Sequence, residues 1–150
     1  MRSCGDCKAC CIVLSVEEID KPRDTPCEHL CEKGCDIYEK RPESCRGFQC
    51  FWLTGIRDDL FRDRDRPDQS GLVVEPAATS AFERRTGLKA LLAHEVFEGA
   101  RHTYAGEALL KRLARTHLVI VVWKDQRKFL GPAFALEEAK SFMKEMGVTT

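Results

Sequence analysis

Nine cysteines are the residues whose types and spacing best suit this chain to chemistry, and none lies beyond position 50. The stretch SCGDCKACC, from Ser3 to Cys11, contains two overlapping Cys-x-x-Cys steps through Cys4, Cys7 and Cys10. This spacing lets one loop place two sulphurs around a single ion, and thiolates select zinc, copper(I) or iron–sulphur clusters. The cysteines therefore predict a metal site. Further candidate ligands follow at Cys27, Cys35, Cys45 and Cys50.

Other uses of the thiols agree less well with the pattern. A disulfide framework is typical of oxidising compartments and of an even count spread along the chain, whereas here the count is odd and the last hundred residues contain no cysteine. A thioredoxin-like couple at Cys7 and Cys10 would need a helix N-terminus after a strand, and only six residues precede Cys7. A bacterial ferredoxin run fails at its fourth position, because Cys11 follows Cys10 at once.

The adjacent pair Cys10 and Cys11 leaves the number of metal sites open. In extended backbone, neighbouring side chains point to opposite sides. The two sulphurs would then serve different sites, or one would be a ligand and the other a buried spare. Free cysteine is among the most often buried residue types, so one structural ion with several spare thiols and two four-ligand sites both remain as interpretations.

A second cysteine-rich stretch, CDIYEKRPESCRGFQC, makes the pattern specific. Together with CGDCKACC and Cys27, it closely resembles the YkgJ-type cysteine-cluster family, for which zinc or iron chelation has been suggested. The resemblance covers roughly the first third of the chain and implies a ligand class rather than a reaction. Cys31 lies outside the family pattern and is the expected spare. The non-cysteine matches are Ile37, Tyr38, Arg41, Pro42, Arg46 and Phe48. The resemblance implies the ligand set Cys4, Cys7, Cys10, Cys11, Cys27, Cys35, Cys45 and Cys50.

Several polar and aromatic residues near the cysteines have two interpretations. Arg41 and Arg46 could donate to metal-bound thiolates or to a bound anion, since a four-cysteine zinc site is negatively charged, or they could be surface or backbone-capping residues. Tyr38 and Phe48 are expected to pack around the site. His29 could replace a sulphur as a zinc ligand, although a loop histidine is more often solvated.

The remaining composition excludes several function classes. Lys and Arg number 24, as do Asp and Glu, so the net charge gives no reason to expect a nucleic-acid partner. No apolar run approaches the roughly 18 residues of a membrane span, and no signal-peptide apolar region is visible. We expect a cytoplasmic protein whose partner is a metal ion. The stretch HEVFE, from His94, resembles the zincin motif, but Glu98 stands where the second histidine should be.

The composition changes near residue 55. Residues 1–55 are predicted to form a Cys-rich metal-binding module, and residues 56–150 a small α+β region. The two are expected to pack together as one compact domain. A helix is expected from Pro42 to about Leu53, with Cys45 on it and Cys50 near its end.

The second region contains most of the periodic segments. Strands are predicted at 72–75, 117–123 and 128–131, with KDQR as the turn between the last two. The segment 87–99 is ambiguous and favours a strand over a helix. Helical spacing covers 103–116 and the stripe Leu136, Ala139, Met143 and Met146. The expected fold class is α+β, a Cys-rich module followed by a small sheet with two packed helices.

Metal binding through the cysteine cluster, in a structural or metal-handling role, is the function that the sequence favours. The metal would be zinc or iron, the latter as an ion or an iron–sulphur cluster. An iron–sulphur redox or metal-dependent modifying enzyme is one alternative. A zinc-stapled adaptor for protein interaction is another. A structural site would be closed by four protein ligands, whereas a catalytic site would keep an open position.

Overall fold

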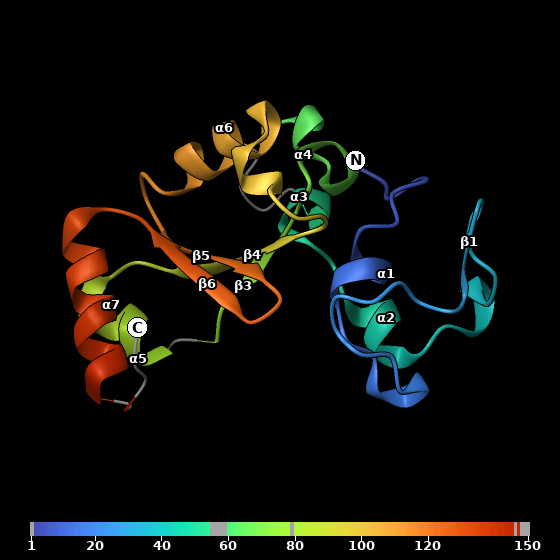
Figure 1. The fold of residues 1–150 in the computed structure, drawn as a ribbon, viewed down its shortest axis with the longest axis horizontal. Helices are drawn as coiled ribbons and strands as arrows, with labels where there is room; N and C mark the ends of the chain where they lie inside the picture. The colour runs from blue at the N-terminus through green and yellow to red at the C-terminus, as the bar shows by residue number, and fades with distance from the viewer. Residues whose placement is uncertain (1, 55–59, 79, 146, 148–150) are drawn as a thin grey trace.

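The computed structural model describes residues 2–54, 60–78, 80–145 and 147, and in them a cysteine-rich segment lies beside a four-stranded sheet (Figure 1). The predicted boundary at 55/56 falls on residues outside this description. No helix in the described ranges is both long enough and apolar enough to cross a membrane. The first segment contains α1 (Cys10–Val13), η1 (Glu17–Ile19), β1 (Leu30–Cys31), β2 (Gly34–Cys35), η2 (Tyr38–Lys40), α2 (Glu43–Gly47) and α3 (Phe51–Thr54). The rest contains η3 (Asp63–Asp65), α4 (Pro67–Ser70), β3 (Leu72–Pro76), α5 (Ser80–Thr86), β4 (Ala90–Glu95), η4 (Ala100–His102), α6 (Tyr104–Leu113), β5 (Leu118–Trp123), β6 (Gln126–Leu130) and α7 (Ala133–Glu145).

The larger sheet has the order β3-β4-β5-β6. β4 pairs with β3 and β5 with β6 in antiparallel fashion, while β4 and β5 are parallel and are joined by the crossover through α6. β5 is apolar and β-branched, as a strand buried on both faces must be. The described secondary structure confirms an α+β fold.

Helices cover both faces of the sheet. Leu109 and Leu113 of α6 pack in one cluster with Leu91 and Val119, while Phe82 of α5 and the α7 alanines pack in a second cluster with Ala90 and Leu118. Strand alternation accounts for this division, because neighbouring residues such as 90 and 91 point to opposite faces.

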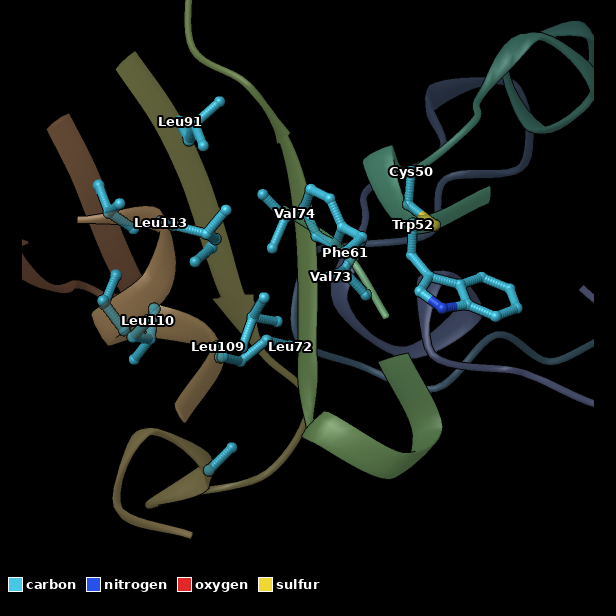
Figure 2. Packing of buried hydrophobic residues seen from close by; sticks show 14 of the residues in the cluster. Cys50, Trp52, Phe61, Leu72, Val73, Val74, Leu91, Leu109, Leu110 and Leu113 are labelled. Carbon is cyan, nitrogen blue, oxygen red and sulfur yellow. The ribbon is translucent and has the colours of Figure 1, made fainter. Parts of the chain in front are cut away.

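The cysteine-rich segment joins the sheet at β3. Cys50, Trp52 and Phe61 lie on one side of β3 and the α6 leucines beyond its other side (Figure 2), all within one apolar cluster. The Trp52 indole donates to the Arg62 carbonyl at 3.0 Å. Arg2 donates to the carbonyls of Trp52 at 3.0 Å and Phe61 at 2.8 Å. The N-terminus is thereby tied to the segment that leads into the sheet.

A buried carboxylate organises that leading segment. Asp65 is only 2% exposed, and its carboxylate accepts a hydrogen bond from the Arg62 backbone amide at 2.7 Å. The same carboxylate forms an ion pair with Arg112 of α6. Arg112 also donates to the Leu60 carbonyl at 2.9 Å, and the buried Ser70 hydroxyl donates to the Asp65 carbonyl at 3.1 Å. η3, α4 and α6 are held together by one polar network.

Some sequence predictions were right and others wrong. The strands at 72–75 and 117–123 and the helix within 103–116 are confirmed, and the ambiguous segment 87–99 contains strand β4. The single helix from Pro42 to Leu53 was wrong: extended backbone at Phe48 separates α2 from α3, and Cys50 precedes α3. The β1–β2 hairpin and α5 were not predicted.

Gly106 in α6 gives a first test of this packing. Alanine normally stabilises a helix interior by about 0.5–1 kcal/mol relative to glycine. Here an added Cβ would lie 2.1 Å from the Ala100 carbonyl oxygen. We therefore expect Gly106→Ala to destabilise the protein by about 1–3 kcal/mol in urea denaturation.

Gly47 provides the matched control for Gly106. It ends α2, and an added Cβ would meet no atom within 4 Å. Gly47→Ala should leave the urea midpoint unchanged or raise it. An equal loss of stability in both variants would contradict the clash with Ala100.

Candidate metal-binding cysteine cluster

The first cysteines lie on a tight turn that runs directly into α1. The Cys7 amide donates to the Cys4 carbonyl at 2.9 Å, and Gly5 supplies the positive φ of 53° inside the turn. Cys10 then opens α1 and Cys11 follows it. Four thiols thus lie within eight residues of the chain, from Cys4 to Cys11.

The chain folds back onto α1 through a backbone hydrogen bond. The Cys27 amide donates to the Cys11 carbonyl at 3.0 Å. Lys21 is 7% exposed, and its ammonium donates to the carbonyls of Ile12, Leu14 and Pro22. Lys21 thereby satisfies carbonyls at the end of α1, a role that no sequence signal indicated.

The hairpin β1–β2 places its two cysteines differently. Cys35 is paired with Leu30, and Cys31 with Gly34. Since Leu30 and Cys31 are neighbours on one strand, Cys31 and Cys35 point to opposite faces. Cys31 is exposed and Cys35 half-buried.

Cys45 lies in α2, whose first turn is fixed by a contact with Glu18. The Glu18 carboxylate accepts from the Ser44 amide at 3.1 Å and from the Ser44 hydroxyl at 2.8 Å. This contact caps α2 from outside the helix, and the Ser44 donors lower the pKa of Glu18. Cys50, the most buried of the cysteines, lies at the junction with β3.

The thiols act on one another electrostatically. Burial raises the pKa of four thiols: Cys4, Cys7, Cys45 and Cys50. The charges of neighbouring cysteines raise the pKa of Cys4, Cys45 and Cys50 further. The Cys10 thiol donates to Cys11, which raises the pKa of Cys10 and lowers that of Cys11 to about 6. Partly buried thiols whose thiolate forms repel one another are the electrostatic setting that a bound cation would relieve.

The arginine and aromatic candidates near the cysteines have different surroundings in the structure. Arg41 donates to the Tyr38 carbonyl at 3.0 Å and lies over the Tyr38 ring, yet its charge lowers the pKa of both Cys4 and Cys11. Tyr38 is 57% exposed, so the expectation that it packs around the site was wrong. Phe48 packs against the core cluster, and Arg46 is exposed.

His29 is engaged by carboxylates. Its Nδ1 lies 3.0 Å from Asp36 and its Nε2 3.7 Å from Glu28. Both ring nitrogens of His29 therefore face carboxylates.

Two competing motifs lack their structural context. In the described ranges the first strand begins at Leu30, so no strand precedes Cys7 and Cys10 as a thioredoxin-like couple requires. His94 lies on β4 and pairs with Glu75 at 2.7 Å, so it does not share a helix face with Glu98 as in a zincin.

All nine cysteines are described, and all are free thiols. Within the described residues, no three His, Cys, Asp or Glu side chains meet closely enough to hold a metal ion. The candidate ligands are therefore neighbours that would have to draw closer to share one ion.

Comparison of the chain with protein-family models, with curated proteins and with solved structures gives no match.

Proposed function

We propose that the cysteine-rich segment binds zinc or iron through Cys4, Cys7, Cys10, Cys11, Cys27, Cys35, Cys45 and Cys50, in a structural or metal-handling role. The observation that carries the proposal is the gathering of these free thiols, from separate turns, helices and a hairpin, within range of one another's charge. Thiolate ligands suit both zinc and iron–sulphur clusters.

The sparse apolar core of the segment supports the same proposal. In residues 2–54 the buried apolar side chains are Ala9, Val13, Val16, Cys50 and Trp52. Segments of this size with so little core usually need disulfides or a metal to fold. Since the thiols are free, metal ligation is the cross-link that the residues present can supply.

The surrounding cations fit a cluster of thiolates. Arg41 and Arg66 both lower the pKa of Cys4, and Lys21 and Arg41 both lower that of Cys11. Metal-bound thiolates carry excess negative charge, and neighbouring donors and cations stabilise them. The residues thus fit zinc or iron, provided that the sulphurs draw together on binding.

Anaerobic purification of the full chain tests this proposal. Zinc, iron and acid-labile sulphide are measured in the same sample, and a visible spectrum is recorded. Colourless protein with stoichiometric zinc supports a zinc site, and brown protein with iron and sulphide supports a cluster. Metal-free protein that is natively folded and takes up neither zinc nor iron overturns the proposal.

A further inference from the structure

The strand β6 forms an edge of the four-stranded sheet and leaves backbone groups unpaired. Among the described residues β6 pairs with β5 alone, in a register that sets Trp123 opposite Gln126 across the two-residue turn Lys124–Asp125. In such a hairpin the closing pair exchanges both of its backbone hydrogen bonds. Because hydrogen-bonded and non-hydrogen-bonded pairs alternate along antiparallel strands, the amides and carbonyls of Arg127 and Phe129 point away from β5.

The exposed side chains along this edge are mainly cationic. Lys124, Arg127 and Lys128 are exposed, and Asp125 is the one carboxylate at positions 124–128. The Lys124 ammonium lies 5.3 Å from the Trp123 ring, and the Arg127 guanidinium donates to the carbonyls of Lys124 at 2.8 Å and Gln126 at 3.0 Å. In the part of the chain that the structure describes, none of these three cations pairs with a carboxylate. Their charge is available to a partner.

The two faces of β6 carry the same order of side chains. Arg127 and Phe129 point to one face, and Phe129 packs with the cluster under α5 and α7. Lys128 and Leu130 point to the other face, and Leu130 packs with the cluster under α6. Phe129 and Leu130 are only partly buried. Each face therefore presents a cation followed by an apolar side chain to any strand laid beside β6.

A pocket continues this edge at the hairpin turn. The turn points toward the cysteine-rich segment (Figure 1), and a pocket of about 370 Å³ lies between them. It is lined by Arg23 and Asp24 of that segment and by Lys124 and Asp125 of the turn. A chain that ran along β6 would find room beyond the end of the strand, with the exposed Arg23 as a further cation.

We propose that β6 is the docking edge for an extended acidic segment of a partner protein, which adds to the sheet antiparallel to β6. From its own N-terminus, the segment would present two apolar residues, opposite Leu130 and Phe129, and then two acidic residues, opposite Lys128 and Arg127. The free backbone groups of β6 supply the main-chain hydrogen bonds of strand addition, and the cations select the acidic partner. The same cations disfavour apolar strands and a second copy of β6.

A labelled synthetic peptide tests the selection of an acidic partner. A fluorescein-labelled peptide with a central Val-Ile-Glu-Glu sequence should bind the reduced full chain in fluorescence anisotropy, and a Val-Ile-Lys-Lys peptide should not. Lys128→Glu sets like charges opposite each other and should weaken binding of the acidic peptide about tenfold. Lys111→Glu makes the same change of charge on α6, where the Lys111 side chain is 74% exposed, and should leave the affinity unchanged.

Backbone methylation of the peptide distinguishes strand addition from charge attraction, and it uses the unmodified chain. The amides of the second apolar and second acidic residues would face Phe129 and Arg127, while the other two amides would point away. N-methylation of the facing pair should abolish binding, and N-methylation of the other pair should preserve it. The inference is overturned if the acidic peptide does not bind, if both methylated peptides bind equally, or if single-stranded RNA binds more tightly than the acidic peptide.

Discussion

Removal of the proposed metal is expected to unfold the cysteine-rich segment while the sheet β3–β6 stays folded. The segment buries few apolar side chains, whereas the sheet is packed on both faces by α5, α6 and α7. Structural zinc contributes on the order of 10 kcal/mol or more to the folding of small cysteine-rich domains. The apolar contacts of Trp52 and Val13 should stabilise the segment too little to compensate for the loss of that free energy.

Hydrogen exchange read by mass spectrometry checks this prediction. Peptides from residues 2–54 should lose protection after chelation under reducing, anaerobic conditions, and peptides from β4 and β5 should keep it. Cys31→Ser is the control and should respond as the unmodified protein does. If metal removal, verified by elemental analysis, leaves protection of residues 2–54 unchanged, the metal does not support the fold of the segment.

Asp65→Ala is expected to cost about 3–5 kcal/mol of stability, the range found when one partner of a buried ion pair is removed. Asp65 is almost fully buried, and its loss leaves the Arg112 guanidinium without its carboxylate and the Arg62 amide without its acceptor. The substitution should lower the midpoint of urea unfolding followed by circular dichroism.

Asp63→Ala is the matched control for Asp65. Asp63 belongs to the same short helix, but its side chain is 96% exposed and its contact with Arg2 spans 3.5 Å. This variant should unfold at close to the midpoint of the unmodified protein. Equal losses from the two substitutions would show that η3 itself, rather than the buried ion pair, carries the stability.

Hydrophobic periodicity predicted the sheet region well because packing there follows local pattern. The β-branched run of β5 and the helical spacing of α6 each had a single consistent interpretation, and the structure confirms both. α5 was missed since SAFERRT carries one strong apolar anchor, Phe82, too few for a periodic signal.

The cysteine-rich segment was less predictable because non-local polar contacts determine its shape. Glu18 caps α2 across 26 positions, and Lys21 holds three carbonyls around the end of α1. Neither contact has a sequence signature. The cysteine types and spacing still indicated candidate ligands, and the family resemblance left out Cys31, whose side chain the hairpin register points away from Cys35.

The two edges of the four-stranded sheet differ in a way that affects solubility. β6 is an open edge that carries Gln126, Arg127 and Lys128, and charged edges of this kind resist pairing with apolar or like-charged strands. The first three residues of β3, Leu72 to Val74, are apolar, and they pack in one cluster with Trp52 of α3 and with Phe61 (Figure 2). A chain whose cysteine-rich segment has come loose would expose Leu72, Val73 and Val74 as an uncharged edge, so self-association should accompany metal loss and should begin at β3.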